Sequence, residues 1–505
     1  MFLASNALEL THILIMENIV TISVILGGAV LAAVAASIGM SGTIQMTSRR
    51  GHGYLHLIFY IMLLLVALPN LISGRDLTTT PLSMMERGDS VRAPLMALLQ
   101  PVFSLLILAL AGERIISHWI KPQKDTQVPV VLLTVFIIFW AGTVLAPALL
   151  GAHPKISHDY LYSLVIGIAV LLASGIERDM AFRAARDALF VFMVAGLLLI
   201  PVLPATVMDV AYTQGLIPGL PRLAGLAAHP VSLGALAQLG LLCLLACPYR
   251  RRWLNRLAWL VGLSVLFLAQ SKTSWVSFAL CAACIVLARS GGNFMRRAGD
   301  PQRSELGIVT LLVFMAVVAL IGGVLMFGNL DSRLASFFDS SEGAQLTSLT
   351  GRDQIWAIAY DEWQRNPLFG YGPTIWDENF RTAIGMPNAT HAHNQFMDTL
   401  SRSGAVGAAA LVLYALVLLV SSVRYTRVSG GLTLALFLAL ALRSVSEVPL
   451  DIFGYGTELL THMLLLMTLA AAASASRVAA KSTAAARHQV YATGPIPASA
   501  VRISL

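Results

Sequence analysis

Long apolar segments recur along most of the chain, and they restrict its fold more than any other feature of the sequence. A lipid bilayer requires about 20 consecutive apolar residues per helix, and thirteen segments come close to that length. Only 12% of the 505 residues are charged and 57% are hydrophobic, whereas soluble domains carry about 25% charged residues. Such a chain lacks the polar residues to cover a water-facing surface. The sequence therefore predicts an all-α polytopic membrane protein with 12–13 transmembrane helices.

The loops between these segments differ in charge, and the difference predicts the orientation of the chain. Lys and Arg are enriched on the cytoplasmic side of membrane proteins. If the chain has thirteen spans and an external N-terminus, 22 of its 34 Lys and Arg residues lie on the cytoplasmic side. If the first span is absent, twelve spans remain with both ends inside, and the later loops stay on the same sides of the membrane. This distribution accounts for the net charge of +8, so the lipid bilayer is an expected partner and nucleic acid is not. The predicted spans are residues 18–40, 54–73, 95–112, 128–150, 160–176, 189–211, 231–247, 257–270, 275–289, 306–327, 404–422, 431–446 and 459–476.

One long loop and one tail divide the chain into four parts. Residues 1–327 hold the N-terminal transmembrane helices, and residues 328–403 form a long external loop. Residues 404–476 hold the C-terminal spans. The basic, Ala- and Ser-rich tail 477–505 is expected to be cytoplasmic and disordered.

The long loop carries patterns of folded structure. A helix is predicted to start just after Thr350, and a second, short helix is predicted from about Ala392 to Arg402, with Gly404 as its end. A loop of this length is usually functional or disordered, and the helical spacing favours a folded, functional loop. The apolar residues with this spacing in the first helix are Ile355, Trp356, Ala359, Tyr360 and Trp363.

Arg352 is a candidate anion-binding residue. It lies in the first turn of the first predicted loop helix, where a cation opposes the helix dipole and does not stabilise the helix. An arginine beside free helix N–H groups can bind phosphate. The alternative is a simple ion pair with a neighbouring acid such as Asp353.

His391 and His393 are candidates for acid–base chemistry. Two histidines at this spacing could hold a metal, but no carboxylate–histidine set at ligand spacing completes a site in the sequence, and we expect no metal and no cofactor. Histidine titrates near neutral pH and is a suitable general base. The alternative for each residue is a structural histidine. The Cys281-x-x-Cys284 pair lacks a second ligand pair and is expected to be apolar helix packing.

Further cations are predicted near the external membrane surface. Arg222 is the only basic residue of its loop, and an unpaired charge so close to hydrocarbon is usually functional. Lys272, in a tight external turn, is a weaker candidate because a lysine there can simply extend to the interface. Arg443, near the external end of its span, is weaker still. External cations and a base together suit a lipid-linked diphosphate substrate.

These motifs together resemble the bacterial O-antigen ligase and polysaccharide polymerase superfamily. His393-Asn394, followed after nine residues by Gly404-Ala-Val-Gly407, is similar to its signature. The resemblance covers residues of about 220–420 and extends to three further motifs. These are Arg222-x-x-Gly225, Gly351-Arg352 with Trp356, and the run Asn-Pro-Leu-Phe-Gly-Tyr-Gly at 366–372.

The resemblance implies a metal-independent, inverting glycosyltransferase of the C-type membrane fold in the bacterial inner membrane. Its donor would be an undecaprenyl-diphosphate-linked glycan, used on the periplasmic face. Arg222 and Arg352 would hold the diphosphate, with Lys272 as a third cation, and His393 would be the catalytic base. A chain-length regulator or a flippase of the same pathway would be a possible partner.

His393 is favoured over His391 because of its place in the predicted short helix. At the helix start, the positive end of the dipole keeps an imidazole neutral, and Phe396 is expected to anchor that face to the membrane domain. His391 precedes the helix and is expected to orient the loop. Asn394 and Gln395 are candidates for hydrogen bonds to the acceptor.

The acceptor distinguishes the branches of the superfamily. Ser-Lys-Thr at 271–273 and Gly-Tyr-Gly at 370–372 resemble exopolysaccharide polymerases, and Ala408 stands where ligases tend to have Thr. A polymerase, which adds repeat units to another lipid-linked glycan, is therefore favoured over a ligase acting on lipid A–core. A polysaccharide or lipid transporter is a third possibility, but such proteins place charges within their spans and show inverted repeats. This sequence has few charges within its spans, Arg443 and Asp209 being the nearest cases, and no visible repeat.

Overall fold

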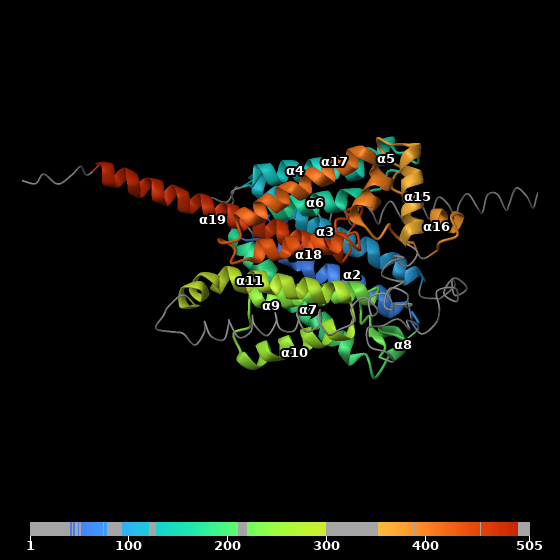
Figure 1. Cartoon of the computed structure of the whole chain (residues 1–505), viewed down its shortest axis with the longest axis horizontal. Coiled ribbons are helices and arrows are strands. Elements are labelled where there is room, and N and C mark those ends of the chain that lie inside the picture. Colours follow the sequence, from blue (N-terminus) through green and yellow to red (C-terminus); the bar gives the residue numbers. More distant parts are fainter. Residues whose placement is uncertain are drawn as a thin grey trace, which may run out of the picture.

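The computed structural model describes residues 52–73, 75–77, 93–120, 128–210, 220–298, 352–387, 389–454 and 456–492, with a few more between 41 and 49. In these residues the chain forms a bundle of roughly aligned helices, and its only sheet pairs two short strands (Figure 1). The first half contains η1 (Leu55–Leu57), α2 (Ile58–Ile72), α3 (Ala93–Ile120), α4 (Val130–Trp140), the π-helix η4 (Ala141–Leu145), α5 (Ala146–Leu150), α6 (Tyr160–Leu171), α7 (Gly175–Leu198) and α8 (Pro204–Val207). The second contains β1 (Met208–Asp209), β2 (Arg222–Leu223), α9 (Pro230–Ala246), α10 (Arg252–Leu268), α11 (Lys272–Ala298), α15 (Arg352–Arg365), α16 (Glu378–Ala383), α17 (Gln395–Arg424), α18 (Leu432–Ser444) and α19 (Glu458–Ala492).

The predicted all-α membrane architecture is confirmed. Every predicted span within the described residues overlaps a helix of the bundle, whereas the predicted spans 18–40 and 306–327 lie outside those residues. Six of the described helices are long and apolar enough to cross a membrane. The lipid-facing surface is correspondingly apolar, and the interior holds one large cluster of buried aliphatic and aromatic side chains.

Two predicted boundaries are wrong for identifiable reasons. The span predicted at 189–211 corresponds to α7, which begins at Gly175 and ends at Leu198. A capping box, in which Ser174 and Glu177 bond each other's backbone N–H groups, starts this helix early. Pro201 and Pro204 prevent its continuation. In the tail, residues 477–492 are helical as the end of α19, because alanine has the highest helix propensity.

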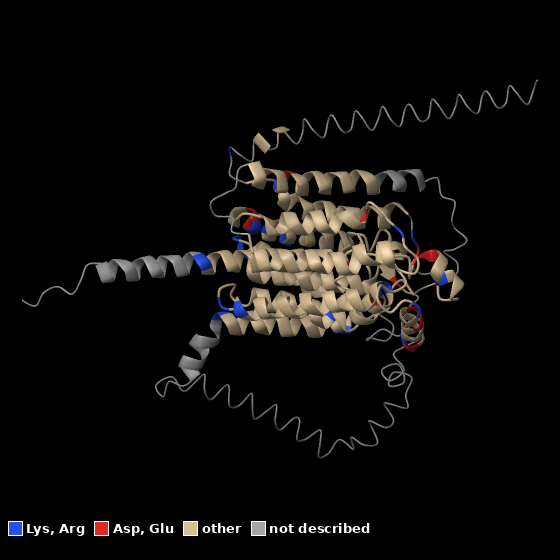
Figure 2. Cartoon of the chain, turned by 90° about the horizontal axis from the view of Figure 1, so that it is seen from above, with Lys and Arg blue, Asp and Glu red and all other residues tan. Residues whose placement is uncertain are grey.

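Charged side chains lie mainly at the two ends of the bundle, and its middle is apolar (Figure 2). One end, here called the loop end, carries α15, α16 and the segments that precede α9, α11, α17 and α19 (Figure 1). The other, here called the basic end, carries the α9–α10 connection with Arg250, Arg251 and Arg252. All the predicted site residues fall at the loop end, as the alternation of spans requires.

Helix α17 is broken where it enters the bundle from the loop end. Gly404 has φ 61° and ψ −161°, so the helical hydrogen bonds are interrupted there. The run at 366–372 satisfies the freed backbone groups: Tyr371 N–H donates to Ser401 O over 2.8 Å, and Ala405 N–H donates to Pro367 O over 2.8 Å. Within a membrane such replacement bonds are required, because no water is present to supply them.

Glycine is required at this break for steric reasons. A Cβ on Gly404 would lie 2.4 Å from the backbone of Leu368, and one on Gly370 would lie 2.6 Å from the backbone of Arg402. Both glycines also have positive φ. Two motifs of the family resemblance, the 366–372 run and Gly404, are therefore parts of one backbone joint.

The described part of the long loop is folded, as predicted, and rests on the loop end. Helix α15 begins at Arg352, and α16 is capped by Asp377, whose carboxylate accepts the Phe380 N–H. Between these helices and the start of α17 lies a small separate core. Its buried residues are Ala359, Ile375, Trp376, Phe380, Ala389 and Ala392.

Candidate active site

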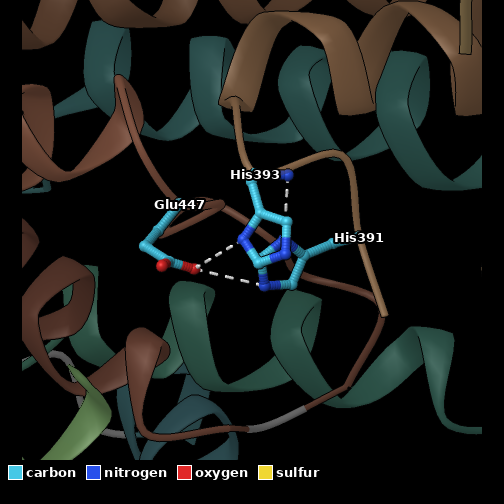
Figure 3. A group of neighbouring side chains, drawn as sticks. All are labelled: His391, His393 and Glu447. Carbon is cyan, nitrogen blue, oxygen red and sulfur yellow. Dashed lines mark hydrogen bonds and ion pairs between the residues drawn. The ribbon is translucent and has the colours of Figure 1, made fainter. Parts of the chain in front are cut away.

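Two histidines and a glutamate from distant parts of the sequence meet at the loop end (Figure 3). His391 Nε2 lies 3.2 Å from Glu447 Oε2, and His393 Nδ1 lies 3.7 Å from the same oxygen. The two imidazole centroids are 4.2 Å apart. All three side chains are mostly buried but retain access to solvent, with exposed fractions of 26%, 27% and 16% for His391, His393 and Glu447. This group is called the histidine–glutamate cluster below.

Hydrogen bonds on both sides fix the loop that carries the histidines. The carbonyl of Ala392, between them, accepts the indole N–H of Trp356 over 2.8 Å. The N–H of Ala392 donates to the Asp398 carboxylate over 3.0 Å. One bond comes from α15 and the other from α17, so both helices determine where the imidazoles point.

The backbone at His393 is itself unusual. His393 has φ 49°, in the left-handed region, which costs a non-glycine residue of the order of 1–2 kcal/mol. Such conformations persist where the surrounding structure enforces them, often at functional sites. In this conformation the His393 N–H donates to His391 Nδ1 over 3.0 Å.

The prediction for the start of the short helix needs correction. α17 begins at Gln395, and Asn394 is its N-cap, with its side chain accepting the Met397 N–H over 3.0 Å. His393 therefore precedes the helix, and its orientation comes from the left-handed turn rather than from the first helical turn. Phe396 is 47% exposed and does not anchor this face to the bundle.

Asn394 and Gln395 hold the neighbouring chain segment. Asn394 donates to Val445 O over 3.4 Å, and Gln395 Oε1 accepts the Leu450 N–H over 2.8 Å. These contacts lie on either side of Glu447 in the sequence. The two side-chain amides were predicted to bind the glycan acceptor. In the structure they form hydrogen bonds with the backbone of the segment that carries Glu447.

The pKa values of the cluster reflect the pairing. Burial raises the pKa of the Glu447 carboxyl, but the adjacent His391 and His393 lower it by more, so that it lies well below its usual range. Burial lowers the pKa of His391, but its hydrogen bond to Glu447 and the Glu447 charge raise it above its usual value. Glu447 is consequently a carboxylate at neutral pH.

Arg222 lies in the same electrostatic neighbourhood. It is buried in β2, where it pairs with Asp209 of β1 in register, and its Nε donates to Ala269 O over 3.3 Å. Burial lowers the pKa of the adjacent His229, the charge of Arg222 lowers it further, and the charge of Glu447 raises it. The structure therefore places Arg222 and the histidine–glutamate cluster in one electrostatic neighbourhood.

Arg75, a residue that the sequence did not single out, holds the loop that carries Arg222. Its guanidinium donates to the carbonyls of Thr206, Gly225, Ala227 and Ala228 over 2.6–3.2 Å. The Arg222-x-x-Gly225 turn is thereby fixed against the end of α2. The signal for this role was weak, because Arg75 lies in a different loop.

Arg352 is the first residue of α15, as predicted, and its side chain is partly buried. Trp356, one turn further along, contacts the histidine loop through its indole. The N-terminal turns of α15 therefore lie beside the cluster.

The weaker cation candidates have different surroundings. Lys272 is exposed at the start of α11. Arg443 forms an ion pair with Glu458, in which Arg443 Nη2 donates to the Glu458 carboxylate over 2.6 Å. Arg443 and Glu447 also line one small pocket. The other residues of that pocket are Val231, Gln238, Ser271, Thr273, Ser274, Ser277 and Ser446.

Glu447 is the member of the cluster that sequence reasoning missed. It follows α18, more than fifty residues after the histidines, so no local spacing could reveal it. It also corrects the expectation that no carboxylate–histidine set exists: one donor atom from each of His391, His393 and Glu447 lies within 4.8 Å of the others. Two histidines and a carboxylate are a known zinc ligand set, so this cluster is the group to consider for a metal within the described residues.

Comparisons with known proteins bear on the second half of the chain. Residues 257–412 match the family model described as O-Antigen ligase. The matched segment includes Arg352, His391 and His393 but neither Arg222 nor Glu447. No curated protein matches the chain.

Proposed function

Because residues 257–412 match the family model described as O-Antigen ligase, we propose that the chain is a polysaccharide polymerase. It joins undecaprenyl-diphosphate-linked repeat units, without a metal and with inversion at the anomeric carbon, on the periplasmic face of the bacterial inner membrane. The observation that carries this proposal is that a partly exposed, conformationally strained His393 and the buried Arg222 both lie near His229, at one end of an apolar bundle.

The proposed reaction assigns one role to each side chain. His393 accepts the proton of the acceptor hydroxyl, whose oxygen then bonds to the anomeric carbon of the donor. The bond from that carbon to the diphosphate breaks, and its electron pair leaves with undecaprenyl diphosphate. Arg222 and Arg352 neutralise this leaving group, which is the usual way in which preorganised cations lower such a barrier. Lys272 is a possible third cation.

A ligase is the second candidate, because the description of the matched family names that activity. The two differ in the acceptor alone. The Gly-Tyr-Gly run at 370–372 resembles polymerases, but it also has a structural role in the backbone joint at Gly404. Its presence therefore does not identify the acceptor, and an experiment must do so.

Reconstitution tests the proposal. Purified protein in proteoliposomes receives undecaprenyl-diphosphate-linked oligosaccharide, with or without lipid A–core, and the products are separated by length. A polymerase gives a ladder of lengthening glycan without lipid A–core, in the presence of EDTA. Addition of a glycan to lipid A–core alone indicates the ligase, and absence of both products from all donors refutes the glycosyltransferase proposal. His158→Asn, at an exposed histidine of the same end, is the matched control for His393→Asn.

Labelling tests the proposed side. In a background without the four native cysteines, Thr390→Cys should react with a membrane-impermeant maleimide in intact spheroplasts, because Thr390 is exposed beside the cluster. Arg251→Cys, at the basic end, should react only after the membrane is disrupted. The reverse pattern would put the cluster in the cytoplasm.

A further inference from the structure

Glu447 has no role in the reaction described so far, although it is the residue that His391 and His393 share. It belongs to the α18–α19 connection, outside the segment matched by the family model. Its Oε2 faces both imidazoles (Figure 3). A role for Glu447 in preparing the base rests on the proposed function, in which His393 is that base.

The hydrogen bond to His391 Nδ1 determines where the proton of that ring lies. A backbone N–H can only donate, so Nδ1, which accepts the His393 N–H, carries a lone pair in the neutral ring. The ring proton is then on Nε2, which lies 3.2 Å from Glu447 Oε2. His391 thus donates to Glu447 and is not available as a base at Nε2.

His393 has the opposite orientation. Its Nδ1 is buried, without a hydrogen bond within the described structure, and Glu447 Oε2 is 3.7 Å away. The ring as a whole is 27% exposed, and Nε2, unlike Nδ1, is not among the buried atoms without a partner in the described residues. A proton on Nδ1 faces the carboxylate and leaves the Nε2 lone pair for the acceptor hydroxyl.

We propose that Glu447 is the positioning residue of the catalytic base: it receives Nδ1–H of His393 and Nε2–H of His391, and so presents Nε2 of His393 to the acceptor. When Nε2 takes the acceptor's proton, the imidazolium that forms lies beside a carboxylate already in place. His391 is a second donor that holds the carboxylate, and the contacts of Asn394 and Gln395 with the Glu447 segment keep that carboxylate in position.

A metal held by the same three residues is the competing explanation. A neutral imidazole that binds a metal through Nε2 carries its proton on Nδ1. At His391 that proton would meet the His393 N–H, which is 3.0 Å away and points at the same atom. Metal binding would therefore replace a hydrogen bond by a contact between two donors, whereas proton donation from Nε2 to Glu447 preserves it.

Substitution of Glu447 tests the proposal in the reconstituted full-length protein. Glu447→Gln should lower kcat by about 10- to 100-fold while leaving the KM for the lipid-linked donor unchanged, because the base is affected and the diphosphate contacts are not. Glu447→Asp should recover part of kcat. Glu378→Gln, which removes an exposed carboxylate from α16 at the same end of the bundle, is the matched control and should leave kcat unchanged.

The pH profile separates positioning from a structural role. A carboxylate favours the imidazolium form, so its removal should move the acid limb of kcat to lower pH, whereas general destabilisation would lower kcat without this movement. Arg222, His229, Asp398 and Asp451 also influence the cluster, and all four remain in Glu447→Gln. Unchanged kcat and pH profile in this variant would overturn the proposal. So would loss of wild-type activity in EDTA that zinc restores.

A second measurement does not depend on activity. Nitrogen chemical shifts of ¹⁵N-histidine-labelled protein, assigned by comparison with His391→Asn and His393→Asn, report which ring nitrogen is protonated. We expect Nε2–H at His391 and Nδ1–H at His393 when the rings are neutral, with loss of the Nδ1–H preference in Glu447→Gln. Nε2–H at His393 in the wild type would overturn the positioning role, even if no donor supports transfer and the proposed function fails.

Discussion

The molecule has a buried carboxylate cluster at each end, and the two are built differently. At the basic end, Glu177 is fully buried and accepts the N–H groups of Gly53 and Ser174, each over 2.7 Å, while Arg114 lies 3.4 Å away. At the loop end, Glu447 is 16% exposed, and its partners are titratable imidazoles. The carboxylate of Glu177 has fixed donors on regular elements, whereas that of Glu447 has donors that can lose their protons.

We interpret the Glu177 cluster as structural and the Glu447 cluster as the proposed reactive site. The Glu177 cluster joins η1, α3 and α7 through permanent donors, and a change of protonation there would leave a buried charge unpaired. The Glu447 cluster combines partial exposure, a left-handed residue and neighbouring cations. Both contain a buried acid near a base, so burial and pairing alone do not identify a site. Titratable partners and access to solvent do.

The largest expected effect concerns the base. His393→Asn should reduce kcat for glycan transfer by about 100- to 10,000-fold, the usual contribution of general base catalysis, while the unfolding free energy hardly changes because the side chain is partly exposed. Transfer is measured in proteoliposomes, and unfolding in detergent. Near-normal turnover in His393→Asn together with an inactive His391→Asn would move the role to His391.

The corresponding change at the basic end should affect stability instead. Arg114→Ala leaves the Glu177 carboxylate buried without its cation and should cost about 3–5 kcal/mol, seen as poor yield or unfolding at lower denaturant. The protein that does fold should transfer glycan at the wild-type rate per molecule. If Arg114→Ala instead inactivates folded protein, the contrast between the two ends fails.

The arginines of the loop end should show a third pattern, that of donor binding. Hydrogen bonds to charged groups contribute about 1.5–3 kcal/mol each, so Arg222→Ala and Arg352→Ala should each weaken donor binding by about 10- to 100-fold. Arg→Lys should recover part of it, since lysine keeps the charge without the planar fork. The measurement is binding of labelled lipid-linked donor to protein in nanodiscs. Unchanged binding in Arg352→Ala would remove it from the diphosphate site.

The fold was predictable where it depends on local pattern. Apolar length located the spans, and Gly404 was correctly expected to end a short helix. It was not predictable that the freed backbone would bond to Tyr371 and Pro367, because that joint depends on tertiary contacts. The helical tail beyond Arg477 was missed because low hydrophobicity was given more weight than alanine's helix propensity.

The candidate site was predictable only in part, for a similar reason. His391, His393 and Arg222 were identified because their types are unusual near a membrane surface. Glu447 and Arg75 were missed, since each acts on a segment more than fifty residues away in the sequence. A residue that positions another leaves no motif of its own, and only the folded chain shows its partner.

The smallest expected effect is the pH dependence of the Glu447 cluster's contribution to stability. The pKa of His391 is raised above 6.5, so the stabilisation from its charged form is fully present below that value and is lost as pH rises through the raised pKa. The pKa of Glu447 is lowered from 4.5, so its contribution is present above that value and is lost only as pH falls through the lowered pKa. The full effect therefore lies between these two ordinary values.

His391→Asn should accordingly destabilise the protein more at about pH 5.5 than at about pH 9, by about 1 kcal/mol. The difference is small because protonation of His391 Nδ1 ends its hydrogen bond with the His393 N–H, which offsets part of the gain from the ion pair. The measurement is the unfolding free energy of both proteins in detergent at the two pH values, with His158→Asn as the exposed control. A larger loss at high pH would mean that the neutral, Nε2-protonated ring binds Glu447 better than the imidazolium does. The hydrogen bond to Nδ1 would then dominate the cluster, and the contrast with Glu177 would weaken, because both ends would hold their carboxylates with donors that do not titrate.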